Sequence, residues 1–371
     1  MHYEFDTVFT KIVSQLSENK HPCMANDISN INHRLVLYGA GGNCEFALWY
    51  YTKIFNFEVS CLCDSKATGN FEYNNISYDI ITPKQLIENY TDAFVLITTW
   101  NFEKEIKDFL IELGFPSDQV YYFRHRPQSL DSFMEKHYEG YKWAYNFFKD
   151  ANSKRLVIDR IKLFLYGTAI LPDSPWNSGY FACPYVTLND NEVFIDADGY
   201  TGDTVMDFLQ KVKKYSHVYS FEPDPRNYNQ LLGNVSECNN ITVVKSGLWS
   251  ESTELRFCVN NDSASSAIST QPGPEQNIDI PVISLDKFFE RKPKKEYPTL
   301  IKMDIEGSEK EALIGGTQVI NMNKPKLIIC AYHKTEDIYE LAKTLTNIRG
   351  DYDVKLWKIG HSFWDMVMYA V

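Results

Sequence analysis

The chain has 371 residues and a formal net charge of -12 at pH 7. One hydrophobic core rarely grows beyond about 250–300 residues, so this length predicts two domains. The acidic balance disfavours nucleic acid and anionic membranes as main partners, because phosphate binding needs a basic surface. With 44% hydrophobic and 23% charged residues, the composition is that of a soluble globular protein.

The amino-terminal segment and the cysteines favour a cytoplasmic protein. Residues 1–20 mix charged and apolar side chains and lack the apolar run of a signal peptide. No stretch approaches the roughly 20 apolar residues of a membrane span. The eight cysteines are scattered, and Cys61 and Cys63 have no second pair at zinc spacing. We therefore expect free thiols in a reducing compartment, not a disulfide framework or a metal site.

The first third of the chain predicts a helix followed by an α/β block. Residues 1–32 form the N-terminal helical segment, because apolar side chains recur at helical spacing from Phe5 to Leu16. Residues 33–126 alternate strands with helices, which predicts a Rossmann-like parallel sheet with right-handed crossovers. The elements expected there are strands at 34–38, 59–63, 93–97 and 120–123 and a helix at 43–54.

The rest of the chain predicts a second α/β block behind a connector. Residues 127–190 are rich in aromatic side chains and are expected to form a helical connector. Residues 191–371 again alternate strands and helices, and the last two strands are close enough to pair as a hairpin. The strands expected in this block are 193–195, 217–221, 241–245, 300–303, 326–330, 352–358 and 365–371. The predicted fold class is α/β, with two doubly wound Rossmann-like domains.

A glycine-rich turn follows the first strand. Gly39, Gly41 and Gly42 would allow close backbone approach to a phosphate at a helix N-terminus, and Asp64 ends the next strand, where it could hold a ribose hydroxyl. The glycine pattern is incomplete, because Cys44 stands at the third glycine position. The alternatives are a nucleotide or nucleotide-sugar site and a Rossmann-like fold that binds nothing tightly.

An acid-rich turn follows the first strand of the second block. Pyrophosphate would be repelled by its carboxylates, whereas S-adenosylmethionine carries an ammonium and a sulfonium group and no phosphate. Glu222, which ends the next strand, has the spacing of a ribose-binding carboxylate. The candidate cofactor-binding residues are therefore Asp196, Asp198, Gly199, Tyr200, Gly202, Asp203 and Glu222, with Asp304 from a later strand.

Four segments of the second block form a recognisable set: 193–204, 219–225, Ser284-Leu-Asp286 and 301–309, of which Lys302-x-Asp-x-Glu-Gly-x-Glu309 is the most specific. Through these segments the block resembles the FkbM family of methyltransferases. The resemblance implies a class I methyltransferase fold, with a mostly parallel seven-stranded sheet closed by an antiparallel hairpin. It also implies methyl transfer from S-adenosylmethionine to an oxygen, often a hydroxyl of a sugar or a secondary metabolite. The N-terminal block resembles a Rossmann-like module that accompanies some of these proteins.

One position departs from the family pattern. The family keeps glycine where Asp198 stands, which lets the backbone approach the methionine end of the cofactor. Asp198 facing the cofactor's carboxylate would cost on the order of 3 kcal/mol, about two decades in affinity. Facing the ammonium instead, Asp198 would help binding. Gly199, one place later, is a candidate for the role of the missing glycine.

The candidate catalytic residues follow strands, where doubly wound sheets bind ligands. Asp304, Glu306 and Lys302 surround the end of one strand, and His333 follows the next as a candidate general base. Glu309 has a helix N-terminal role as its alternative, and His361 ranks below His333. Asp304, Glu306 and His333 are plausible metal ligands, but we expect no metal.

Residues 262–266 lie in a loop predicted to run to Pro281, which could line the acceptor pocket or be a surface excursion. The overall prediction is a cytoplasmic O-methyltransferase that uses S-adenosylmethionine on a small-molecule or glycan acceptor, such as a nucleotide sugar or a surface-glycan precursor. Homo-oligomerisation stays open. The alternatives are a non-catalytic protein that retains the fold and a bifunctional nucleotide-sugar enzyme.

Overall fold

The computed structural model divides the chain into two compact units. The larger comprises Met1–Asp6, Asp131–Asp159 and Ile170–Val371, and the smaller comprises Thr7–Leu130 and Arg160–Ala169. The structure describes residues 2–18, 34–41, 43–49, 51–52, 57–99, 102–122, 129–166, 179–259, 267–268, 276–359 and 365–371. Within these ranges, no helix combines the length and apolarity needed to cross a bilayer.

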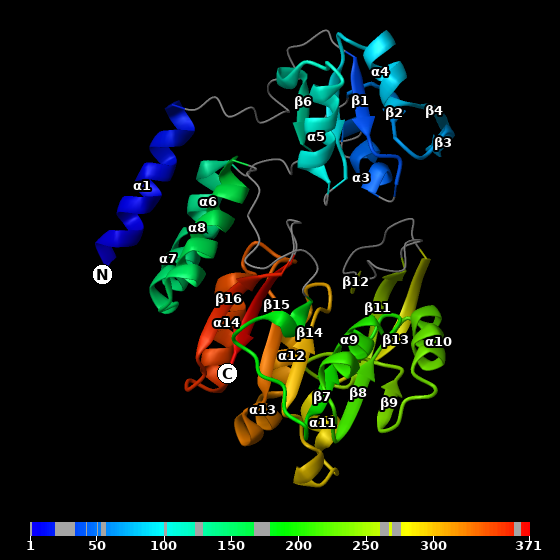
Figure 1. Ribbon diagram of the computed structural model, residues 1–371. Coiled ribbons are helices and arrows are strands. Elements are labelled where there is room, and N and C mark those ends of the chain that lie inside the picture. Colours follow the sequence, from blue (N-terminus) through cyan, green and yellow to red (C-terminus); the bar gives the residue numbers. More distant parts are fainter. Residues whose placement is uncertain are drawn as a thin grey trace. The chain divides into compact units, whose positions relative to one another are not determined.

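The smaller unit is built on a six-stranded sheet (Figure 1). Its strand order is β3-β4-β2-β1-β5-β6, and every neighbouring pair is parallel except β3 with β4. The strands are β1 (Leu35–Tyr38), β2 (Val59–Cys63), β3 (Gly69–Tyr73), β4 (Ile76–Ile81), β5 (Phe94–Ile97) and β6 (Val120–Tyr122). Strands β1, β2, β5 and β6 lie where the sequence predicted them.

Helices cover both faces of this sheet, as a doubly wound fold requires. Leu35 and Leu37 of β1 point to one face, where they pack with Leu48 of α3 (Asn43–Trp49). Val36 points to the other face, where the side chains of α4 (Pro83–Asn89) and α5 (Glu103–Glu112) complete the core. Strand β6 follows a short 3-10 turn, η2 (Ser117–Gln119). The predicted helix at 43–54 is shorter within the described residues, and residues 53–56 lie outside them.

The antiparallel hairpin of β3 and β4 was not predicted from the sequence. Its turn places Asn74 and Asn75 at positive φ, 49° and 62°, a conformation that asparagine tolerates better than most residues. Most side chains of β3 are exposed or half-buried, so the strand lacks the apolar run that marked its neighbours. The smaller sheet is therefore mixed rather than wholly parallel.

The larger unit contains a seven-stranded sheet in the order β16-β17-β15-β14-β7-β8-β9. Strands β9, β8, β7, β14 and β15 are parallel, and β17 pairs antiparallel with both β15 and β16. The strands are β7 (Val193–Asp196), β8 (His217–Phe221), β9 (Ile241–Val244), β14 (Leu300–Met303), β15 (Lys326–Cys330), β16 (Val354–Lys358) and β17 (Met366–Ala370). All seven lie where the sequence predicted strands.

Two groups of helices cover this sheet. On one face, Phe194 of β7 packs with Phe208 of α9 (Asp203–Lys211) and Leu231 of α10 (Pro225–Asn234). On the other, Tyr219 of β8 contacts the ring of Phe289, and the mutually contacting helices α11 (Leu285–Phe289), α12 (Glu309–Gly315), α13 (Thr317–Asn323) and α14 (Asp337–Ile348) form the layer. Short 3-10 turns are η3 (Tyr180–Ala182) and η4 (Lys294–Glu296).

A second, four-stranded sheet corrects the predicted long loop. Its order is β10-β13-β11-β12, and its strands are β10 (Gly247–Leu248), β11 (Thr253–Val259), β12 (Ala267–Ile268) and β13 (Gln276–Ile283). Pro281 therefore lies inside β13 and not at the end of a loop. Apolar side chains occupy every second position of β13, at Ile278, Ile280 and Val282. They pack together with Trp249 and Leu255. Residues 262–266 lie outside the described residues.

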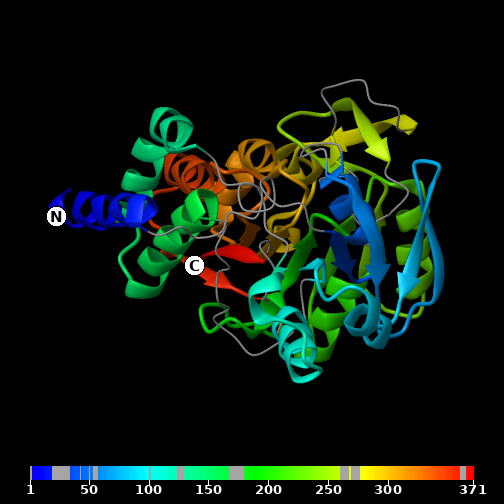
Figure 2. The same ribbon diagram turned by 90° about the horizontal axis from the view of Figure 1, so that it is seen from above.

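Helices occupy most of the described part of the predicted connector, and its residues 131–159 belong to the larger unit. It contains α6 (Leu130–Lys136), α7 (Tyr138–Phe147) and α8 (Ala151–Tyr166), and the ring of Phe5 in α1 (His2–Glu18) contacts that of Tyr145. Helix α7 lies beside α14 (Figures 1 and 2). Ser153 Oγ of α8 accepts from the backbone N–H of Leu356 in β16, 2.8 Å away, so α8 shields the edge of the sheet.

Candidate active site

The turn after β7 is held against β8 by its backbone. The N–H of Gly199 donates to the carbonyl of Phe221 at 2.8 Å. A Cβ at position 199 would lie 2.4 Å from Ser220 Oγ and 2.6 Å from Leu231 Cδ2, so glycine is required there by close packing. Tyr200 and Gly202 then adopt positive φ, 43° and 94°, before α9 begins.

Asp196 is buried beneath this turn and pairs with a lysine on the neighbouring strand. Its Oδ1 lies 3.3 Å from Lys302 Nζ, and its Oδ2 accepts from Ser220 Oγ. Burial raises the pKa of Asp196 to about 6, against the opposing effect of Lys302. Lys302 Nζ also donates to the carbonyl of Asp198 at 3.1 Å. The predicted catalytic Lys302 thus holds the turn in place, and the pKa of its ammonium is raised by the facing carboxylates, although burial opposes this shift.

A cavity of about 270 Å³ opens at the carboxyl ends of β7, β8 and β14. Of the predicted site residues, it is lined by Asp198, Tyr200, Asp203, Glu222, Lys302, Asp304 and Glu306. Asp196, Gly199, Gly202 and His333 do not line it. The residues that sequence reasoning missed are Tyr180, Ala197, Thr204, Pro223, Asn227, Gly247, Leu248, Ile280, Val282, Ile305, Ser308 and Tyr332.

Two carboxyl groups face each other on the β7 and β8 side of the cavity. Glu222 Oε1 accepts from the N–H of Asp224 at 2.7 Å, while its buried Oε2 has no hydrogen-bond partner among the described residues. Burial raises the pKa of Glu222 to about 7. Burial, joined by the charges of Glu222 and Asp304, also raises the pKa of Asp198 well above its usual value, although Lys302 opposes the shift. This wall can accept protons, hydrogen bonds or a positive charge.

Asp304 is the fixed anion of the opposite wall. Its Oδ2 accepts from Tyr180 Oη and its Oδ1 from Tyr332 Oη, each at 2.7 Å. Burial alone would raise the pKa of Asp304, but Lys302, His333 and the two tyrosines hold it below its usual value. Burial and the neighbouring acids raise the pKa values of both tyrosines, so they remain hydrogen-bond donors. Tyr332, adjacent to the predicted His333, could have been found from its position after β15.

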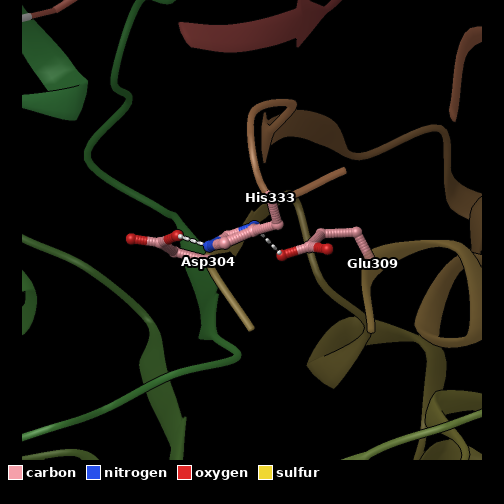
Figure 3. A group of neighbouring side chains, drawn as sticks. All are labelled: Asp304, Glu309 and His333. Atoms are coloured by element: carbon pink, nitrogen blue, oxygen red, sulfur yellow. Dashed lines mark ion pairs between the residues drawn. The ribbon is translucent and has the colours of Figure 1, made fainter. Parts of the chain in front are cut away.

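His333 lies behind Asp304 and between carboxylates (Figure 3). Its Nε2 is 3.4 Å from Asp304 Oδ1 and 3.6 Å from Glu306 Oε2, and its Nδ1 is 3.1 Å from Glu309 Oε1. Burial lowers the pKa of His333, but Glu309, Asp304 and Glu306 outweigh this effect and raise it to about 9. The surrounding carboxylates therefore favour the imidazolium form of His333, which differs from the neutral base expected from its ordinary pKa.

The two glutamates beside His333 have different surroundings. Glu306 adopts a positive φ of 53° and lines the cavity, and burial raises its pKa to about 7. Glu309 is buried at the first position of α12, where its Oε1 also accepts from the N–H of Ile305 at 2.8 Å. Glu309 thus combines the predicted helix N-terminal role with a contact to His333. His361 lies outside the described residues.

The glycine turn of the smaller unit is held by the side chain of Asp64. Asp64 Oδ2 accepts from the N–H of Ala40, and Oδ1 accepts from those of Lys66 and Ala67. Gly39 has a φ of 117°, and a Cβ there would lie 2.7 Å from Thr99 Cγ2. Asp64 therefore braces the turn with the carboxylate that was predicted to hold a ribose. A Cβ on Gly41 would meet no atom within 4 Å, and Gly42 lies outside the described residues.

Comparisons with known proteins agree with the resemblance seen in the sequence. Residues 195–352 match the family model "Methyltransferase FkbM domain". A solved methyltransferase FkbM from Methylobacillus flagellatus KT is 21% identical, with 99% of this chain and 98% of that chain covered at a TM-score of 0.70. This likeness shows a shared fold along nearly the whole chain.

More distant structures align with about half of the chain. A fibrillarin from Aeropyrum pernix in complex with natively bound S-adenosyl-L-methionine is 12% identical, covering 49% of this chain and 67% of that chain at a TM-score of 0.32. An rRNA methylase from Streptococcus thermophilus is 15% identical, covering 49% of this chain and 88% of that chain at a TM-score of 0.30. No curated protein matches significantly. Residues 195–352, which contain most of the residues that line the acidic cavity, are thus similar to the methyltransferase domain of the FkbM family.

Proposed function

We propose that this methyltransferase uses S-adenosylmethionine to methylate a hydroxyl group of a sugar, a nucleotide sugar or a surface-glycan precursor. The observation that carries the proposal is the buried Oε2 of Glu222, a residue of the cavity lining, because this oxygen has no hydrogen-bond donor in the part of the chain that the structure describes. A buried acceptor of this kind is costly unless a ligand satisfies it. A ribose hydroxyl is such a donor.

The residues on the β7 and β8 side fit this cofactor chemically. Glu222 would accept hydrogen bonds from the ribose, and Asp198 would face a positive charge of the cofactor. Asp203 adds a third carboxylate to the cavity lining. Asp196 forms an ion pair with Lys302 beneath the turn. Bound S-adenosylmethionine supplies a methyl group on a sulfonium, a leaving group that needs no further activation.

The residues on the β14 and β15 side fit an acceptor hydroxyl. Asp304 stays ionised and lies against the cavity with its carboxylate fixed by two tyrosine hydroxyls, so it can orient the acceptor O–H by accepting its hydrogen bond. Glu306, with a pKa raised to about 7, can take the proton that the hydroxyl loses. Alignment of the oxygen with the methyl group supplies most of the remaining catalysis.

The acceptor class rests on the polarity of this wall. Carboxylates and tyrosine hydroxyls meet apolar side chains such as Ile280 and Val282 in one cavity, which suits a ligand with hydroxyls on one side and C–H groups on the other. A saccharide has this character. The resemblance to the FkbM family favours the same acceptor class.

Transfer of labelled methyl groups tests the proposal. The protein is incubated with S-adenosylmethionine labelled in its methyl group and with pools of oligosaccharides, nucleotide sugars and phenols, and mass spectrometry identifies the products. We expect O-methylated saccharides, with at least 100-fold less product from Asp304→Asn. Label only in non-carbohydrate products would reject the acceptor class, and no transfer to any pool or cell extract would reject the activity.

A further inference from the structure

Four ionisable side chains converge behind the cavity wall. Asp304 and Glu306 come from the turn after β14, Glu309 begins α12, and His333 follows β15. Ligand atoms of Asp304, Glu309 and His333 all lie within 4.8 Å of one another. Figure 3 shows the imidazole between the carboxylates of Asp304 and Glu309. Three acids thus surround a single imidazole.

The imidazole is buried without a well-formed hydrogen bond. The side chain of His333 is only 9% exposed, and neither of its ring nitrogens makes a hydrogen bond of acceptable geometry. Its contacts with the carboxylates are ion-pair distances of 3.1 to 3.6 Å. A buried polar ring in this condition, directed at carboxylate oxygens, points to a missing ligand.

The separations around Nε2 have the dimensions of a coordination sphere. Two ligand atoms that each lie about 2.1 Å from a tetrahedral metal ion are about 3.4 Å apart. Nε2 is 3.4 Å from Asp304 Oδ1 and 3.6 Å from Glu306 Oε2. On the other side of the ring, Glu309 Oε1 faces Nδ1 at 3.1 Å. A carboxylate on the second nitrogen is the usual partner of a metal-binding histidine, because it fixes the tautomer and the ring orientation.

We propose that Asp304, Glu306 and His333 Nε2 bind one divalent transition-metal cation, with Glu309 holding the ring from the opposite side. One imidazole with two carboxylates favours Mn²⁺ or Zn²⁺ over Mg²⁺ and Ca²⁺, which prefer oxygen ligands alone. The cation would take the place of the proton on the His333 ring and would offset the excess of carboxylates in this buried cluster. Glu306 would then be a metal ligand, and it would accept the proton of the acceptor only in the metal-free protein. Since Asp304 and Glu306 also line the cavity, it would lie at the cavity wall, within reach of an acceptor oxygen.

The site does not depend on methyl transfer, so its test uses neither cofactor nor acceptor. Full-length protein is freed of metal with a chelator and titrated with Mn²⁺, and free Mn²⁺ is followed by electron paramagnetic resonance. We expect one tight equivalent per chain. His333→Gln and Asp304→Asn should each weaken binding at least tenfold, and Glu309→Gln should weaken it about tenfold through the ring. Competition with Zn²⁺ and Mg²⁺ tests the predicted preference.

Two further variants keep this experiment decisive. Glu306→Gln changes a ligand whose side chain is 35% exposed, so it should fold normally while losing affinity at least tenfold. His217→Gln is the matched control, because that histidine contacts Thr242 at the far end of β8, and it should bind Mn²⁺ as the wild type does. The proposal is wrong if wild-type protein binds neither Mn²⁺ nor Zn²⁺, or if Glu306→Gln and His333→Gln keep wild-type affinity. In that case His333 is an imidazolium paired only with carboxylates.

Discussion

Lys302 and Asp196 are direct neighbours on the parallel strands β14 and β7, and their side chains form a buried ion pair with 3.3 Å between Nζ and Oδ1. The pair joins the family motif of one strand to the acidic turn of the other, because Lys302 also donates to the carbonyl of Asp198. The ammonium group of Lys302 therefore holds the acid-rich turn after β7 in place, and the side chains of Asp198 and Glu222 line the cavity.

Removal of the lysine should destabilise the fold. Lys302→Met leaves Asp196 buried without its partner, a situation that typically costs about 3 to 5 kcal/mol. Lys287→Met is the control, because its ion pair with Glu290 is exposed and is worth less than about 1 kcal/mol. Urea unfolding measures both. Equal losses of unfolding free energy in the two variants would show that the buried ion pair contributes no more to stability than the exposed one.

Two helical glycines should respond to alanine in opposite directions. A Cβ on Gly140 in α7 would lie 2.6 Å from the ring of Tyr339, which is also held by His137. Gly140→Ala should therefore destabilise by about 1 to 3 kcal/mol. Gly233 in α10 has open space around its Cβ position, so Gly233→Ala should stabilise by up to about 1 kcal/mol. Thermal melting of both variants checks the signs. Unchanged or higher stability of Gly140→Ala would contradict the close packing of α7 on α14, and destabilisation by Gly233→Ala would contradict the open space at that position.

Glu222 should make the protein less stable as the pH rises. Its pKa is raised from 4.5 to about 7 in the folded chain, so the folded state binds more protons than the unfolded state between these values. Stability then falls as pH rises through this window. Glu222→Gln removes this effect, and its stability relative to wild type should be roughly 1 to 3 kcal/mol higher at pH 8 than at pH 5. Asp198 and Asp224 face the same carboxyl and remain in both proteins. The same difference at both pH values would contradict the prediction.

His333 should matter for turnover and not for cofactor binding. It contacts Asp304 and Glu306 but does not line the cavity. His333→Ala should lower kcat by about 100-fold or more, while the Kd for S-adenosylmethionine stays within about twofold. His217 lies at the amino end of β8, away from the cavity, so His217→Ala should change neither kcat nor the Kd for S-adenosylmethionine. Unchanged turnover in His333→Ala would remove this residue from the mechanism.

The sequence predicted the parts of the fold that have a continuous apolar signal. Strands such as β14 and β15 are buried along their length, and their apolar runs fix their positions directly. Strand β3 is largely exposed, and β13 contains Pro281, so neither carries this signal. The alternation of Ile278, Ile280 and Val282 was nevertheless present and could have revealed β13.

The candidate site also has a part that the sequence predicts and a part that only the folded chain shows. Asp198, Glu222 and Asp304 were predicted because each follows a parallel strand, and such strand ends meet at one edge of a sheet. The hydrogen bond from Tyr180 to Asp304 joins residues that are 124 positions apart in the sequence. No local sequence pattern predicts such a contact. The charged state of His333 depends on three carboxylates that only the folded chain brings together.

The central claim is that the acidic cavity binds S-adenosylmethionine through Glu222 and Asp198. Calorimetric titration of the wild type, Glu222→Gln and Asp198→Asn at pH 7.5 tests it most directly. Asp279→Asn is the control, because the side chain of Asp279 in β13 is exposed. The account predicts one site in the wild type and in the control, and at least tenfold weaker binding in the two cavity variants, about 1.4 kcal/mol each. Absence of binding by the wild type, or equal affinity in all four proteins, would contradict it.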